Sequence, residues 1–137
     1  MRKATLLALA ALGIMGATTP AMAFQLFDPP IWVVDPAPVY VLIYRDSDWL
    51  CGRGDTWVYR GTFEGLTTYK FVLVVPPGAD FDIKIYDENG NLVASGTASG
   101  STDEVVYLTP LWTGPFRIEV YSYSGCGFYT LKVYEQL

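Results

Sequence analysis

The stretch Phe81–Gly96, with the sequence FDIKIYDENGNLVASG, decides the fold of this chain. Two short alternating segments flank Asn89-Gly90, the dipeptide that best accepts the two positive φ angles of a type I′ turn. The pattern predicts a two-residue β-hairpin in which Tyr86 faces Val93. One face of this hairpin is apolar and the other is mixed, as in a sheet covered on one side. The apolar face is expected to hold Phe81, Ile83, Ile85, Leu92 and Ala94.

Six further segments have strand-like sequences, rich in β-branched and aromatic residues and bounded by proline, glycine or polar turns. Residues 39–44 are expected to be buried on both faces and to end at a polar turn, 45–48. Residues 116–123 and 128–134 both alternate, and we expect them to pair with each other. No segment after residue 23 has helical periodicity with caps. The sequence therefore predicts an all-β antiparallel β-sandwich of about eight strands. The other segments are 57–63, 69–75 and 104–108.

The amino-terminal segment Met1–Ala23 has the features of a cleaved signal peptide. Arg2 and Lys3 precede an apolar segment too short to span a bilayer, and Ala21-Met22-Ala23 offers small residues for cleavage after Ala23. A retained membrane anchor is the alternative. We expect a secreted or periplasmic protein with a proline-rich arm and first strand at residues 24–50. A single sandwich domain would follow at residues 51–137.

The charge of the chain limits its partners. Without Arg2 and Lys3, seven basic residues remain against fourteen acidic ones, a net charge of −7. Nucleic acid and anionic membranes both require a positive surface, so the composition argues against them. No membrane insertion is expected after signal cleavage.

Cys51 and Cys126 are the two cysteines of the chain. A single pair without any histidine fits a disulfide better than a zinc site, which needs about four ligands. Two unpaired buried thiols are the alternative, because the sequence does not show whether the pair is close in space.

Four segments share a pattern of turn glycines and alternating apolar positions. They are Tyr69-Lys70-Phe71, Asp80–Ile83 leading to Tyr86 and Asn89-Gly90, Gly114-Pro115-Phe116 with Ile118 and Val120, and Gly127–Leu131. This order resembles the bacterial pre-peptidase C-terminal domain family over roughly Thr56–Val133. The resemblance implies a jelly-roll-like β-sandwich of the kind attached to secreted peptidases. Similar domains in bacterial collagenases bind collagen and calcium, whereas the proline-rich arm and the cysteine pair are additions to the family pattern.

The absence of histidine from the sequence excludes Ser-His-Asp and Cys-His catalysis and histidine-ligated metals. Asp80 and Asp82 lie at strand spacing on one face, but glycosidase chemistry needs two carboxyl groups that face each other across a cleft. We therefore expect no enzyme activity and no cofactor other than calcium. A small carboxylate-dependent hydrolase is one alternative.

Calcium takes six to eight oxygen ligands, and acidic residues cluster in sequence around the ends of the hairpin. Ordinary solvated turn residues explain the same cluster, because turns favour aspartate for local hydrogen bonds. The candidate calcium ligands are Asp80, Asp82, Asp87, Asp103 and Glu104.

Outward-facing aromatic residues with basic neighbours form a second candidate site, suited to a protein, peptide or glycan surface. The alternative is that a covering segment makes these rings part of the core. The candidate residues are Tyr121, Tyr123, Phe128, Tyr134, Arg117 and Lys132. The sequence thus favours an exported, non-catalytic module for binding or structural support at the cell envelope, with a carbohydrate-binding module as the other alternative.

Overall fold

The computed structural model describes residues 2–5 and 36–137. The expected signal peptide beyond Thr5 and the arm up to Asp35 lie outside these residues. The described chain consists of strands and connecting turns, and it contains no helix long and apolar enough to cross a membrane. The strands are β1 (Arg2–Thr5), β2 (Tyr40–Cys51), β3 (Thr56–Phe63), β4 (Tyr69–Val74), β5 (Asp80–Tyr86), β6 (Leu92–Gly96), β7 (Glu104–Leu108), β8 (Gly114–Ser124) and β9 (Cys126–Gln136).

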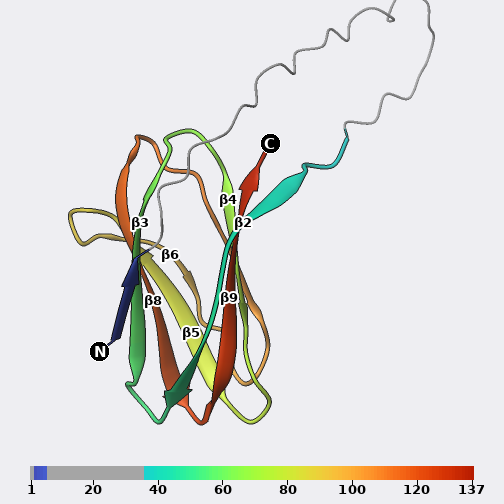
Figure 1. Cartoon of the computed structure of the whole chain (residues 1–137), viewed down its shortest axis with the longest axis vertical. Coiled ribbons are helices and arrows are strands. Elements are labelled where there is room, and N and C mark those ends of the chain that lie inside the picture. Colours follow the sequence, from blue (N-terminus) through green and yellow to red (C-terminus); the bar gives the residue numbers. More distant parts are fainter. Residues whose placement is uncertain (1, 6–35) are drawn as a thin grey trace, which may run out of the picture.

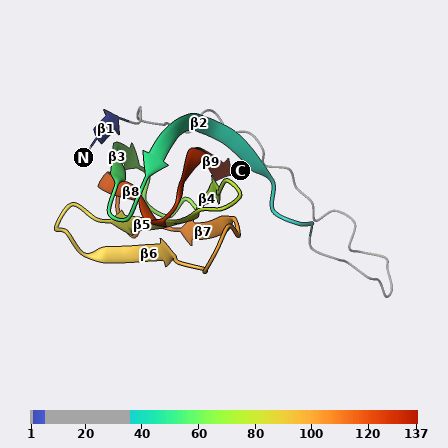
Figure 2. The same ribbon diagram turned by 90° about the horizontal axis from the view of Figure 1, so that it is seen from below.

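The strands form two sheets that pack face to face (Figure 1). The first sheet has the order β1-β3-β8-β5-β6, and the second has the order β2-β9-β4-β7. Every pairing among β2–β9 is antiparallel. Figure 2, which looks along the strands, shows the two layers and the long β2 curving over β9. The predicted antiparallel sandwich is confirmed.

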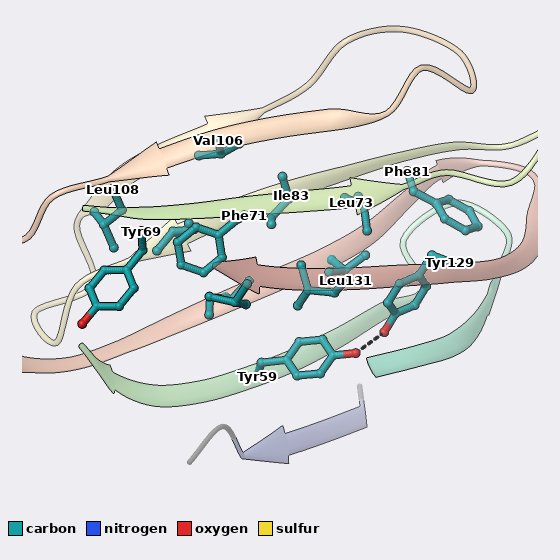
Figure 3. Close-up of a cluster of buried hydrophobic side chains, with 14 of the residues drawn as sticks. Tyr59, Tyr69, Phe71, Leu73, Phe81, Ile83, Val106, Leu108, Tyr129 and Leu131 are labelled. Carbon is teal, nitrogen blue, oxygen red and sulfur yellow. Dashed lines mark hydrogen bonds between the residues drawn. The ribbon is translucent and has the colours of Figure 1, made fainter. Parts of the chain in front are cut away.

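The core lies between the sheets and is built from alternate residues of each strand. In β4 the inward positions are Tyr69, Phe71 and Leu73, all fully buried. Successive side chains of a strand point to opposite faces, so one apolar residue in two is enough to fill the core. Figure 3 shows these side chains meeting those of the facing sheet. The other core side chains that the alternation predicts are Tyr59, Phe63, Phe81, Ile83, Ile85, Phe116, Ile118, Val120, Tyr129, Leu131 and Val133.

The β5–β6 hairpin exists, but its connection is longer than predicted. The amide of Asp87 donates to the carbonyl of Asn91, and the amide of Gly90 donates to the carbonyl of Asp87. Gly90 has a φ of 84°, whereas Asn89 does not have a positive φ. This is a three-residue loop ending in a left-handed glycine, which adds a bulge.

The bulge changes the partners near the turn. Tyr86 pairs with Leu92 instead of Val93, and the register shifts between Ile85 and Tyr86. Leu92 is consequently 52% exposed, so its predicted place on the core face is wrong.

The first predicted strand is much longer than residues 39–44. β2 runs through Arg45–Asp48, which was expected to be a turn, and pairs with β9 as far as Cys51. It is the edge strand of the second sheet, and Val41 and Leu42 are exposed. The prediction that this strand is buried on both faces is therefore wrong.

The expected pairing of the last two strands is also wrong. β8 lies between β3 and β5 in the first sheet, while β9 lies between β2 and β4 in the second. The chain crosses between the sheets at Gly125, which has a φ of 84°. A Cβ atom on Gly125 would approach the Gly78 carbonyl oxygen to 2.5 Å, so only glycine fits this crossing.

A disulfide joins Cys51 and Cys126, as predicted. The two residues are direct partners in the β2–β9 ladder, at the end of β2 and the start of β9. The bridge therefore holds the edge strand to the strand that follows the crossing. It fits a protein that folds in an oxidising compartment.

β1 falls within the expected signal peptide. It pairs in parallel with β3, from Arg2 opposite Trp57 to Thr5 opposite Arg60. Signal cleavage after Ala23 would remove β1 and leave β3 as the edge of the first sheet.

Candidate functional site

The predicted aromatic site does not form one surface. Tyr121, Tyr123 and Arg117 belong to β8 in the first sheet, whereas the other three residues belong to β9 in the second. The outward sides of the two sheets face opposite directions, so the six residues divide between two faces of the molecule. The division follows from the crossing at Gly125. The three residues on β9 are Phe128, Lys132 and Tyr134.

No described segment covers the most exposed rings. Phe128 is 67% exposed and Tyr123 is 49% exposed. Tyr121 and Tyr134 are half-buried on their respective sheets. Side chains of this size in contact with solvent are available to a partner.

We use the name outer face of the second sheet for the side of that sheet that points away from the core. It is formed by β2, β9, β4 and β7. The ladder pairings place its side chains in rows across the strands, with Trp49 beside Phe128 and Lys70 between Tyr134 and Tyr107. Trp49 and Phe128 meet edge to face with ring centroids 5.0 Å apart. The exposed large apolar side chains of this face are Leu42, Trp49, Val105, Tyr107 and Phe128.

Basic side chains lie among these rings. The Lys70 ammonium is 4.8 Å from the ring centroids of both Tyr40 and Tyr134, within the range of cation–π attraction. Arg45 and Lys132 are direct ladder partners on the same face. The outer face of the second sheet therefore combines flat aromatic surface with three cations.

The outer face of the first sheet has a different charge pattern. Arg117 lies over the Tyr86 ring at 4.4 Å and forms an ion pair of 3.2 Å with Glu119. Lys84 lies over the Tyr121 ring at 5.0 Å, and Asp82 pairs with Tyr121 in the ladder. Arg117 is neutralised by Glu119, whereas Arg60, the direct ladder partner of Arg117 on β3, adds a second cation to this face.

Four of the five predicted calcium ligands lie at one end of the sandwich, and Asp87 does not. Asp87 sits at the opposite end of β5, where it accepts bonds of 2.9 Å from the amides of Asn89 and Asn91. These hydrogen bonds, chiefly that from Asn91, lower the pKa of Asp87. Its carboxylate stabilises the turn.

The remaining acidic residues influence each other electrostatically. Burial raises the pKa of Glu104, whose carboxylate accepts a hydrogen bond of 2.6 Å from the Ala98 amide. The charges of Asp82, Asp80 and Asp103 raise the pKa of Glu104 further. Asp103 accepts a hydrogen bond from the Val75 amide at 3.1 Å.

Asp80 and Asp82 line a cavity of about 390 Å³ on the first sheet. One carboxylate oxygen of each is buried without a hydrogen-bond partner among the described residues. Burial raises the pKa of Asp82, Asp80 adds to the rise, and the Tyr121 hydroxyl opposes it. Within the described ranges, no three acidic or cysteine side chains are grouped closely enough to hold a metal ion. The other cavity residues are Thr97, Ser99, Tyr121 and Tyr123.

Two further cavities adjoin the β5–β6 turn. One of about 430 Å³ has Arg60 and Arg117 on the sheet side and Asp87 and Glu88 on the turn side. The other, of about 220 Å³, lies between the turn and the loop carrying Trp112. The Trp112 indole donates to Glu88 Oε1 at 3.4 Å and connects the two segments.

Sequence reasoning missed the β2 part of the outer face of the second sheet. Residues 45–48 are all polar, so they show no alternation of apolar and polar side chains that could have predicted a strand. The polar composition of residues 45–48 led to the prediction of a turn instead.

No model of a known protein family matches the sequence, and no curated protein matches it either. A solved structure does match, the pre-peptidase C-terminal domain of a collagenase from Bacillus anthracis. The TM-score is 0.54, and the match covers 66% of this chain and 87% of that domain. The chain has the fold of a pre-peptidase C-terminal domain. Because the two sequences are only 23% identical, the shared fold is what the match shows.

The pre-peptidase C-terminal fold accounts for the resemblance seen in the sequence. Its matching segments lie on β4, β5, β8 and β9, which make up the centre of both sheets. The resemblance was therefore carried by core alternation and turn glycines, and the two outer faces contribute little to it.

Proposed function

We propose that the protein is an exported, non-catalytic module that binds a surface at the cell envelope or in the extracellular space. The observation that carries this proposal is the outer face of the second sheet, where large apolar side chains are exposed on neighbouring strands. Exposed apolar patches of this kind are typical of interaction sites. Export is supported by the sequence of Met1–Ala23 and by the disulfide.

The chemistry of the chain supports a binding role over a catalytic one. The sequence has no histidine, and both carboxylates of the acidic cavity come from the single strand β5. A hydrolase using two carboxylates would need them to flank a substrate from opposite sides. Binding at the exposed aromatic face does not need two opposed carboxylates.

The test is a binding screen of the purified protein against arrays of glycans, peptides and envelope proteins. We expect the double substitution Tyr107→Ser and Phe128→Ser to remove binding while leaving the melting temperature nearly unchanged, since both rings are exposed. Tyr123→Ser, on the opposite sheet, is the matched control and should bind normally. Binding that survives loss of both rings would overturn the assignment to this face.

Calcium binding at Asp80 and Asp82 is a second candidate function. It is supported by their two buried carboxylate oxygens, which accept no hydrogen bond among the described residues. A bound cation would satisfy these oxygens and offset the cost of burying them. We expect millimolar calcium to raise the melting temperature relative to a chelator, and Asp80→Asn with Asp82→Asn to abolish the rise. An unchanged midpoint in the native protein would rule this site out.

A further inference from the structure

The charges of the second sheet are divided between its two faces. The acidic residues of its strands, Asp46, Asp48, Glu104 and Glu135, occupy inward positions in the ladders. Arg45, Lys70 and Lys132 occupy outward positions, and no acidic residue does so on these four strands, all of which are described. The whole chain has fourteen acidic and nine basic residues. The outer face of the second sheet is thus a positive area on a negative protein.

The cations of this face have no carboxylate partner among residues 36–137. Arg45 and Lys132 lie directly opposite each other, and like charges in this position repel. Neither forms an ion pair with a carboxylate among the described residues. An anion bound between them would remove the repulsion and gain two charge-assisted hydrogen bonds. Arg45 is exposed and Lys132 half-buried, so both are open to such a ligand.

The aromatic rings beside the cations add a second kind of contact. Tyr134 lies on β9 two residues from Lys132, and Tyr107 is reached across Lys70. The C–H face of a pyranose ring packs through apolar contact on aromatic rings that reach solvent, as Tyr107 does and as the half-buried Tyr134 does in part. This face is the surface of a sheet, and such a surface suits extended polymers better than small molecules, which need enclosure.

We propose that the outer face of the second sheet binds an anionic polysaccharide. Acidic groups of the polymer contact Arg45 and Lys132, and its sugar rings lie on Tyr134 and Tyr107. This inference rests on the proposed binding function and specifies its ligand class. The net charge of −7 that remains after signal cleavage opposes the approach of any polyanion, and it opposes duplex nucleic acid more strongly than a polyuronate because the duplex has the denser charge.

The experiment measures affinity for polygalacturonate and for its methyl ester, which has the same backbone without the charge. Dextran sulfate and neutral dextran form a second pair that separates sulfate from carboxylate recognition. We expect the charged member of a pair to bind at least tenfold more tightly than the neutral one. Affinity should fall as salt is raised, because salt screens exposed charges.

Two double variants with the same change in net charge show which cations contribute to the affinity for the charged polymer. Arg45→Ser with Lys132→Ser should weaken binding of the charged polymer at least tenfold. Arg53→Ser with Arg60→Ser removes two exposed cations away from this face and should leave affinity within about twofold. Equal losses in both variants would mean that only the overall charge matters, and would overturn the inference.

The remaining outcomes separate the inference from the proposed function. Charged and neutral polymers could bind equally, with Tyr107→Ser and Phe128→Ser together removing the binding of both. That outcome would overturn the proposal of an anionic ligand but support a binding site on this face. Binding of peptides or proteins alone would overturn the inference in the same way. A dimer in sedimentation that Arg45→Ser with Lys132→Ser dissociates would show that a second copy occupies the face, and would also overturn it. If neither Arg45→Ser with Lys132→Ser nor Tyr107→Ser with Phe128→Ser changes the affinity for any ligand, the proposed function is overturned as well.

Discussion

Tyr59 connects the two sheets through its hydroxyl group. It donates to Asp46 Oδ2 on β2 at 2.6 Å, and its hydroxyl lies 2.7 Å from that of Tyr129 on β9 (Figure 3). Burial and these hydrogen bonds raise the pKa of Tyr59, so it stays protonated. This polar contact inside an apolar core explains how Asp46 can point inward.

Removing the Tyr59 hydroxyl should lower stability. We expect Tyr59→Phe to reduce the free energy of unfolding by about 1–3 kcal/mol, because Asp46 loses a partly buried hydrogen bond. Urea unfolding measures this loss. In a double-mutant cycle with Asp46→Asn, the two effects should be coupled, whereas strict additivity would contradict the contact.

Asp82 and Asp87 should give opposite pH dependences. Asp82 has a raised pKa in the folded protein, so it favours folding below its unfolded pKa and loses this contribution as pH rises through the folded value. Asp87 has a lowered pKa, so its contribution is present above its unfolded pKa and is lost as pH falls through the folded value.

Unfolding measured from pH 3 to 7 tests this contrast. Asp82→Asn should gain stability relative to the native protein as pH rises, while Asp87→Asn should lose it. Parallel profiles for the two variants would contradict the assigned environments. Both substitutions preserve side-chain shape, so the difference reports the charge.

The elements differ in how far local sequence specifies them. β4, β7 and the inward residues of β8 and β9 were predicted closely, because alternating apolar residues leave only one side suitable for the core. β2 was not, since its edge position tolerates both polar and exposed apolar residues. The β5–β6 connection was placed correctly but given the wrong type, because Asn-Gly is compatible with more than one hairpin turn.

The disulfide should contribute strongly to the attachment of β2 and β9. Its cysteines are 75 residues apart, and loop-closure entropy predicts a stabilisation of about 4 kcal/mol for such a loop. We expect Cys51→Ser with Cys126→Ser to lose about this much in denaturant unfolding. The native protein under reducing conditions is the control, and it should unfold at the same denaturant concentration as the double variant. A loss below about 1 kcal/mol would show that the β2–β9 ladder holds without the bridge.

The whole sandwich should fold without its first 23 residues. Among the described residues, every buried side chain of the core lies between Leu50 and Val133, and β1 pairs with the edge of β3 over four residues. We expect a chain beginning at Phe24 to retain the β-sheet circular dichroism spectrum and to melt within about 5 °C of the full-length protein. A chain that is unfolded, or that aggregates through the β3 edge, would contradict this expectation.

The amino-acid pattern alone predicted most of the strands, the inward side of most of them and the fold class, and it favoured a disulfide between the two cysteines. These features are local or compositional, because side-chain alternation has a fixed period of two in any strand. Tertiary structure decided which sheet each strand joins. β8 and β9 each bury one apolar side. This requirement is met whether the two strands form a hairpin in one sheet or the chain crosses between sheets, so the alternation of side chains does not distinguish the two arrangements. The crossing at Gly125 places Lys132 beside Arg45 and separates it from Arg117. The candidate binding face therefore became visible only once the strands were assigned to their sheets.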